Sequence, residues 1–406
     1  MVWLWIGWLW LHFCFEFFLS RINLIYALKK EHTVPAILQD IITQERFEKS
    51  KAYVKENTNF SNIKSVFLFL INVMLLIWVL PSLEKWDLAR VPNYFWQGLF
   101  FFGAIYVIHL ILNLPFAWWE NFRIEQKYGF NTMTMKIFWV DLLKNIITTL
   151  ILGGGFLTGV LWVIQSPIWW WQFTLLVVVF FLISMWIGPT LLMPLFNKFT
   201  PMEEGDLKES LQLFAQQHKI PVKKIFVMDA SKRSTHGNAF FTGIGPTQRL
   251  VVFDTLLTYP IDEVFSIIGH EWGHWKHRDV LRQLLFIIVI VTLLFFTANL
   301  LFNSGWIQRI FHVETSYAVL YYTMAMASPL LFFIEPAMNY LIRLQEFSAD
   351  RFSAQLLQSS KPGMQGLKRI ISDNLSNLYP HPLYKVWYYS HPAPEERIQA
   401  LKSLSW

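Results

Sequence analysis

The residues best suited to chemistry are two histidines and a glutamate in the run His270-Glu271-Trp272-Gly273-His274. Residues four apart on a helix project about 40° from each other, so the two imidazoles can bind one metal ion. Glu271 follows the first histidine and can reach a water on that ion as a general base. The spacing is typical of zinc hydrolases. It predicts one Zn²⁺ per chain, with His270 and His274 as ligands and Glu271 as a catalytic residue.

A catalytic zinc site usually has a third protein ligand. Cys14 is the only cysteine, so the site must be built from histidine and carboxylate groups. Glu346 is the favoured candidate. The membrane spans set out below return the chain at this point to the side of the membrane that carries the two histidines. Glu335 and His277 are the alternatives. Asp350 lies one helical turn after Glu346 and is expected to accept the second N–H of a zinc-bound histidine.

The composition predicts a membrane protein that is mainly α-helical. Hydrophobic residues make up 54% of the 406 residues and charged residues 15%, against about 25% charged in ordinary soluble domains. A membrane span takes about 20 apolar residues. Seven stretches are long enough, near 2–20, 65–83, 94–118, 146–164, 168–196, 281–303 and 316–342.

Positive charge is distributed unevenly between the two sides that seven spans define. One side holds only Lys85, Arg90 and Arg309 of the 34 Lys and Arg residues. Positive loops stay in the cytoplasm, so we expect the N-terminus outside, and the catalytic segment and C-terminus in the cytoplasm. The net charge of +6 is therefore attributed to topology, and no nucleic-acid partner is expected.

Four regions follow from these spans: 1–196 with five spans, the soluble catalytic segment 197–280, spans six and seven in 281–342, and the tail 343–406. Within the catalytic segment we expect a helix over Asp206–His218 and strands at Lys224–Met228 and Leu250–Phe253. Ser231–Gly245 is expected to be a loop or sheet edge, and a helix from Pro260 carries the histidines. The tail is expected to be helical, with breaks at its prolines.

Several motifs resemble the integral-membrane CaaX prenyl endopeptidases, the type I, yeast-type zinc enzymes. The resemblance covers nearly the whole chain and is strongest at HEWGHWKH and EFSAD. Further matching segments are Phe47–Tyr53, Phe122–Asn131 with Tyr128 in place of a usual Phe, Pro194–Pro201, Ser231–Thr242, His391-Pro392 and Arg397-Ile398.

The resemblance implies seven helices around an internal chamber, joined to a zincin-like metallopeptidase domain with a small β element. It implies that substrate lies along a strand edge near 238–242, with Asn238 and Arg397 binding it. His391 is implied to be catalytic, and an imidazole donor there could stabilise an oxyanion. Asn238 could instead support a turn, His391 cap a helix, and Arg397 pair with Asp350. His236, close to this edge, is more typical of a surface loop.

The predicted function is that of a membrane-embedded zinc endopeptidase. Its expected partners are membrane lipid and a polypeptide substrate, by resemblance a prenylated protein cut at its C-terminal CaaX sequence. One alternative is quality-control cleavage of misfolded or stalled membrane proteins. Another, from a different class, is a non-catalytic scaffold or transporter. The expected location is the endoplasmic reticulum or a bacterial inner membrane.

Overall fold

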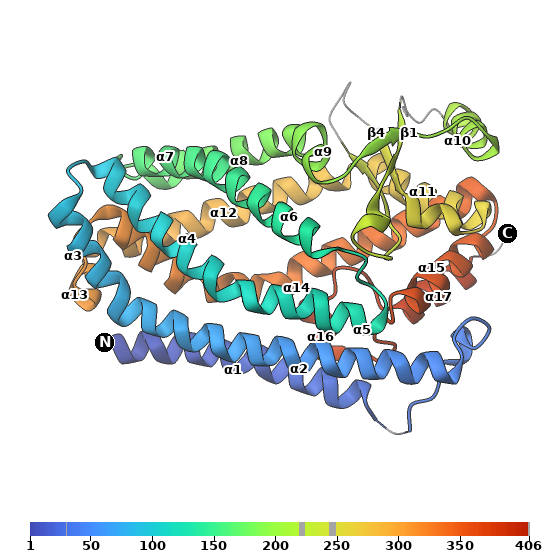
Figure 1. Cartoon of the computed structure of the whole chain (residues 1–406), viewed down its shortest axis with the longest axis horizontal. Helices are drawn as coiled ribbons and strands as arrows, with labels where there is room; N and C mark the ends of the chain where they lie inside the picture. Colours follow the sequence, from blue (N-terminus) through green and yellow to red (C-terminus); the bar gives the residue numbers. More distant parts are fainter. Residues whose placement is uncertain (30, 219–223, 243–248, 405–406) are drawn as a thin grey trace.

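A bundle of long helices runs the length of the molecule, with a small sheet and several short helices at one end (Figure 1). This computed structural model describes residues 1–29, 31–218, 224–242 and 249–404. Within those ranges, seven helices are long and apolar enough to cross a membrane. They are α1 (Val2–Ala27), α2–α3 (Gln44–Met74 and Leu80–Arg90), α4–α5 (Tyr94–Trp119 and Gln126–Tyr128), α6–α7 (Met135–Thr148 and Gly154–Val163), α8–α9 (Trp169–Ile187 and Met193–Phe196), α12 (Asp279–Asn303) and α14 (Ser316–Leu357).

The seven predicted spans are confirmed, but several of these helices extend beyond the membrane. The second begins at Gln44, well before the predicted 65, because the basic stretch ahead of the span is itself helical. The seventh continues to Leu357, so the predicted boundary at 342 falls inside one continuous helix. The four-region division stays a prediction.

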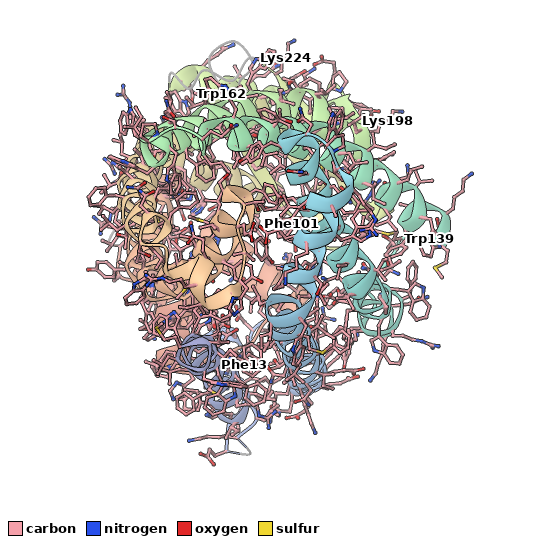
Figure 2. The ribbon with its side chains drawn as sticks, turned by 90° about the vertical axis from the view of Figure 1, so that its left-hand side faces the viewer. Phe13, Phe101, Trp139, Trp162, Lys198 and Lys224 are labelled. Carbon is pink, nitrogen blue, oxygen red and sulfur yellow. The ribbon has the colours of Figure 1, made fainter. Side chains whose placement is uncertain are left out.

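The apolar core of the membrane region lies at the end away from the sheet. Trp5, Phe101, Leu161, Trp169 and Tyr317 are almost fully buried there. Figure 2 views this end, with Phe101 inside the bundle and Trp139 and Trp162 at its outside. The middle of the bundle differs, because no residue of 106–119, 139–159, 175–187, 280–294 or 333–344 is buried. The packed apolar core therefore does not extend through this part of the bundle, where every side chain is exposed or half-buried.

The soluble end contains a four-stranded sheet in the order β1-β2-β4-β3. Its strands are β1 (Phe199–Pro201), β2 (Ile225–Met228), β3 (Ala239–Thr242) and β4 (Arg249–Phe253). β2 pairs in parallel with β4, and β3 pairs antiparallel with β4. The two predicted strands and the edge are confirmed, whereas β1 was not predicted. Positions 243–245 of the predicted loop lie outside the described residues.

Helices α10 (Asp206–Gln217) and α11 (Ile261–Lys276) belong to this end, and both were predicted. The two helices and the sheet share one buried apolar core, which includes Leu211 of α10, Val252 of β4, and Ile268 and Trp272 of α11. The tail forms α15 (Lys361–Asp373), α16 (Pro382–Tyr388) and α17 (Pro394–Lys402), and α13 (Trp306–Phe311) lies at the opposite end. Prolines occupy the first turn of these three tail helices, where their missing N–H costs no hydrogen bond.

Candidate metal centre and peptide cavity

Helix α11 turns its two histidines away from the core because its apolar residues fall on another face. Val264, Ile268 and Trp272 recur every four residues and are buried. Trp272 stacks on Phe214 of α10, with ring centroids 5.5 Å apart. This packing fixes the rotation of α11, so His270 and His274 face α14.

A second face of α11 packs closely against α14 through glycines. A Cβ atom added at Gly273 would lie 2.7 Å from Cα of Ala349, and one at Gly269 would lie 2.8 Å from Oγ of Ser353. Ser353 Oγ also donates to the Ser266 carbonyl at 2.7 Å. The small residues therefore set the short separation that brings Glu346 of α14 to the two histidines.

His270, His274 and Glu346 offer ligand atoms that all lie within 4.8 Å of one another. The two histidine Nε2 atoms are 3.1 Å apart, and they lie 3.4 Å and 3.2 Å from the Glu346 carboxylate oxygens. Glu346 is 2% exposed, and its Oε2 atom has no well-aligned hydrogen-bond donor within the described residues. Two imidazole nitrogens and a buried carboxylate oxygen turned to one point suit a divalent metal ion such as zinc.

Both histidines are oriented by carboxylates through their other ring nitrogen. His270 Nδ1 lies 2.8 Å from Asp350 Oδ1, and His274 Nδ1 lies 2.9 Å from Asp279 Oδ2. Such pairing fixes the tautomer that leaves Nε2 free for a metal. Asp350 occupies the position expected from the sequence. Asp279 was not predicted, although its place five residues after His274, at the start of α12, was visible in the sequence.

The turn between α11 and α12 brings Asp279 back to His274. Arg278 adopts a left-handed backbone conformation, with φ of 55°, directly between the two helices. Asp279 is 1% exposed. The buried carboxylate is therefore held against the histidine by a tight reversal of the chain.

Burial and charge alter the pKa values at the centre of α11. Burial alone would lower the pKa of His270, but the Asp350 and Glu346 carboxylates outweigh it and raise that pKa to about 9. Burial raises the pKa of Glu271, with the two histidines opposing the shift. A raised pKa is what a carboxylate needs if it is to accept and release a proton near neutral pH.

Two tail residues meet the same centre. Arg397 of α17 donates to both Asp350 oxygens, at 2.8 Å and 2.6 Å. Arg397 Nη1 also lies 3.4 Å from Glu346. His391 Nδ1 lies 2.7 Å from Glu346 Oε2, while the His391 side chain is 64% exposed. Arg397 thus pairs with Asp350, which the sequence analysis gave as the alternative to binding substrate. The same side chain also lies beside Glu346, the candidate third metal ligand.

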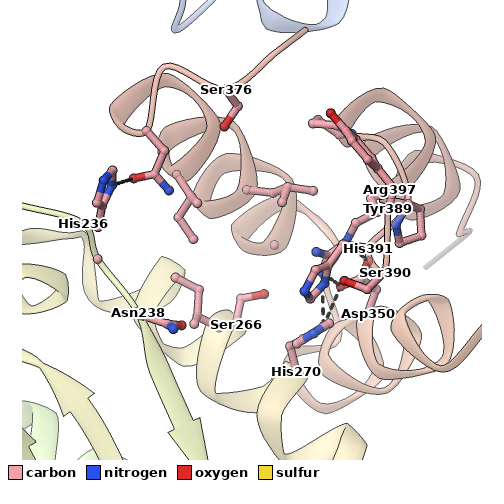
Figure 3. A pocket seen from close by; sticks show the side chains of 18 of the residues that line it. His236, Asn238, Ser266, His270, Asp350, Ser376, Tyr389, Ser390, His391 and Arg397 are labelled. Carbon is pink, nitrogen blue, oxygen red and sulfur yellow. Dashed lines mark hydrogen bonds and ion pairs between the residues drawn. The ribbon is translucent and has the colours of Figure 1, made fainter. Parts of the chain in front are cut away.

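A cavity of about 670 Å³ opens from this centre, and His270, Glu271, Asp350, His391 and Arg397 line one side. Asn238 and His236 line the other side, next to the edge strand β3, as Figure 3 shows. The cavity is therefore lined by every site residue predicted from the sequence except His274 and Glu346, which lie next to His270.

The two alternative ligands do not join the triad. The group of metal-ligating side chains found in the described residues includes neither Glu335 nor His277. His277 packs its ring edge-on against Phe352, with centroids 5.8 Å apart. Glu335 is three turns before Glu346 on α14.

Comparison with known families decides the class of protein. The CAAX prenyl protease N-terminal family, five membrane helices, matches residues 24–198, and peptidase family M48 matches 201–405. The chain belongs to peptidase family M48. Within that family it belongs with the CAAX prenyl proteases, since it is 32% identical to CAAX prenyl protease 1 homolog of Arabidopsis thaliana over 98% of this chain and 96% of that one.

A second relative and a solved structure support the same family assignment. The chain is 33% identical to a probable CAAX prenyl protease 1 of Schizosaccharomyces pombe, over 96% of this chain and 86% of that one. The crystal structure of S. mikatae Ste24p superposes with a TM-score of 0.90 at 28% identity, covering 98% of each chain. The chain is therefore a multi-pass membrane metallopeptidase that acts on polypeptides. This confirms the predicted family, fold class and protease activity.

Proposed function

We propose that the chain is a zinc endopeptidase that cuts prenylated proteins after the modified cysteine of a C-terminal CaaX sequence. The observation that carries the proposal is the triad of His270, His274 and Glu346, of which His270 lines a cavity with an open strand edge. The relatives that match over the whole chain are named CAAX prenyl proteases, which supports this choice of substrate.

The roles of the residues follow from their geometry. His270, His274 and Glu346 would hold one zinc ion, which when bound supplies Lewis-acid activation of water and of the substrate carbonyl. Glu271 lines the cavity beside His270 and takes the proton of the attacking water, then passes it to the leaving amine. His391, on the same side of the cavity and 2.7 Å from Glu346, is placed to donate to the carbonyl oxygen as negative charge develops there.

Substrate binding is proposed to use the edge of the sheet. Within the described residues β3 is hydrogen-bonded to one neighbour only, β4. A strand edge with free N–H and C=O groups binds an extended peptide by adding a strand. Asn238, directly before β3, would fix the peptide backbone there, and Arg397 is proposed to bind substrate from the other side of the cavity.

We also propose that the catalytic end faces the cytoplasm. The sheet and the tail lie at one end of the bundle of long helices, and the N-terminus lies at the other end (Figure 1). Arg46, one of the basic residues expected inside, donates to the Ser372 carbonyl of the tail and so lies at this end.

One experiment tests the activity. Purified wild type, Glu271→Gln and the exposed first-turn control Asp262→Asn are incubated with a farnesylated CaaX peptide and with an unfolded membrane protein. We expect zinc-dependent release of the terminal tripeptide by wild type and control, and a loss of at least about a hundredfold for Glu271→Gln. Cleavage of the unfolded protein alone would instead support quality control. Cleavage of neither would support a scaffold.

The metal assignment has its own test. Glu346→Ala should lose zinc during purification, measured as metal per chain, because only two nitrogen ligands remain. Glu335→Ala serves as the control on the same helix. Full zinc content in Glu346→Ala would show that another residue is the third ligand.

A further inference from the structure

The cavity has a second polar end, away from the metal ligands, that the proposed chemistry does not use. His236, Asn374, Ser376 and Asn377 line it. In Figure 3, His236 and Ser376 lie apart from the cluster of His270, His391 and Arg397. The chemical character of this end follows from how its asparagines are held.

Two asparagines have their amide oxygens occupied by backbone donors. Asn377 Oδ1 accepts from the backbone N–H of Tyr379 at 3.0 Å, and Asn238 Oδ1 accepts from that of Ala239 at 2.8 Å. A backbone N–H can only donate, so each side chain must turn its NH₂ group the other way. Asn377 Nδ2 is buried and has no hydrogen-bond partner among the described residues. Such an unpaired donor is costly unless a ligand satisfies it.

The third asparagine, Asn374, is held by His236. His236 Nδ1 lies 2.6 Å from Asn374 Oδ1, and His236 Nε2 lies 3.8 Å from the Glu125 carboxylate. Glu125 raises the pKa of His236, which favours the form with an N–H on both ring nitrogens. The histidine then donates to Asn374 Oδ1 and leaves the Asn374 NH₂ group for the cavity. Tyr53 donates to Glu125 at 2.8 Å, and Phe130 stacks on the imidazole at 4.5 Å.

The position of His236 relative to β3 indicates which part of a bound peptide lies near these amide donors. The chain before β3 continues beside β4, with Phe253 N donating to Asn238 O and Thr255 Oγ1 donating to His236 O. His236 precedes Asn238 by two residues, or about 7 Å of extended chain. A peptide that pairs antiparallel with this edge runs towards His236 at its C-terminal end. If the residue after the cleaved bond lies opposite Asn238, the third residue lies opposite His236.

We propose that Asn374 and Asn377, with His236 as the residue that positions Asn374, bind the C-terminal carboxylate of the substrate. This rests on the proposed function, in which three residues follow the cleaved bond. A carboxylate is an acceptor that can take both amide N–H groups and Ser376 in addition. Binding of the carboxylate at the polar end of the cavity then favours substrates in which three residues follow the cleaved bond.

The test compares two substrates that differ only at that group. One farnesylated CaaX peptide carries a free carboxylate, and the other carries a C-terminal amide. Wild type should cleave the acid with kcat/KM at least about tenfold higher, the scale of one or two hydrogen bonds to a charged group. Asn377→Ala and Asn374→Ala should reduce this ratio to near one while cleavage of the amide changes little. His236→Asn should reduce it partly, because a neutral donor near the Nδ1 position is retained.

Each outcome is decisive. Gln399→Ala, an exposed change on α17, should keep the full preference for the acid. Equal cleavage of acid and amide by the wild type would overturn the proposal and leave the proposed function intact. An undiminished preference in all three variants would also overturn it. Failure of the wild type to cleave either peptide would contradict the proposed function itself. Amide cleavage shows that each variant is folded.

Discussion

At the scale of single residues, the two histidines are distinguished by their carboxylate partners. His270 shares Asp350 with Arg397, so its partner is already charge-compensated. His274 depends on Asp279, whose other oxygen lies 3.5 Å from Arg282 on an exposed side chain and lacks a hydrogen-bond partner in the described structure. Asp279 therefore devotes its one good hydrogen bond to the histidine.

Asp279→Asn should weaken the proposed zinc site about ten- to a hundredfold, the range typical of such outer partners. Asparagine keeps the size of the side chain but removes the charge that supports His274. Zinc affinity is measured by competition with a coloured chelator. Asp262→Asn on α11 is the control, and an unchanged affinity in Asp279→Asn would contradict the role.

His236 gives a pH dependence of stability. The Glu125 carboxylate, 3.8 Å from Nε2, raises the pKa of His236 above the ordinary value of about 6.5, against the effect of burial. Stability from this pair is fully present below about pH 6.5 and is lost as the pH rises through the folded pKa. Phe130, Asn374 and, through Glu125, Tyr53 are the other groups around the ring.

His236→Asn should therefore lower the melting temperature more at about pH 6 than at about pH 9. The measurement is thermal unfolding of detergent-solubilised protein across that range. His218→Asn, an exposed change at the end of α10, serves as the comparison. A difference that grows with pH would have the wrong sign for this pair.

At the scale of elements, the metal centre depends on the close packing of α11 against α14. Gly273 admits the backbone of Ala349, and a methyl group would have to displace main-chain atoms rather than a flexible side chain. The two helices could separate only by moving Glu346 away from His270 and His274.

Gly273→Ala should therefore destabilise the protein by about 1–3 kcal/mol, which outweighs the gain in helix propensity. It should also reduce zinc content. Gly154→Ala is the matched control, because the added Cβ atom would have nothing within 4 Å. Thermal unfolding and metal analysis are the measurements, and a stable Gly273→Ala protein with full zinc would show that the packing has room.

The elements also show what the sequence could predict. The spans, α10, α11 and the two central strands follow local hydrophobic and turn patterns, and these were predicted. Strand β1 was missed because its three residues, ending in proline, carry no strand pattern of their own and pair only through β2. Asp279 was missed because its role depends on the reversal at Arg278. The pairing of His236 with Glu125 joins residues 111 positions apart, which no local pattern reveals.

At the scale of the whole molecule, orientation in the membrane can be tested with cysteines. Cys14 is the only native thiol, so Cys14→Ser provides a background without reactive sulfur. In intact cells or sealed vesicles, Gln399→Cys at the catalytic end should be shielded from a membrane-impermeant maleimide added outside. Lys85→Cys at the opposite end should be labelled. The reverse pattern would invert the proposed topology, and labelling after detergent shows that both thiols are accessible.

Helix α14 is one unbroken element of 42 residues, about 63 Å long, whereas the apolar core of a bilayer is about 30 Å thick. The N-terminal part of α14, which contains Pro329 and Pro336, lies in lipid. The C-terminal part extends beyond the membrane and carries Glu346. A helix adapts to a thinner or thicker bilayer by tilting. A tilt of α14 would carry α11 with it, because the close contacts at Gly269 and Gly273 hold the two helices together. Metal affinity should therefore change little as acyl-chain length is varied in reconstituted vesicles, so the paired helices insulate the metal centre from membrane thickness.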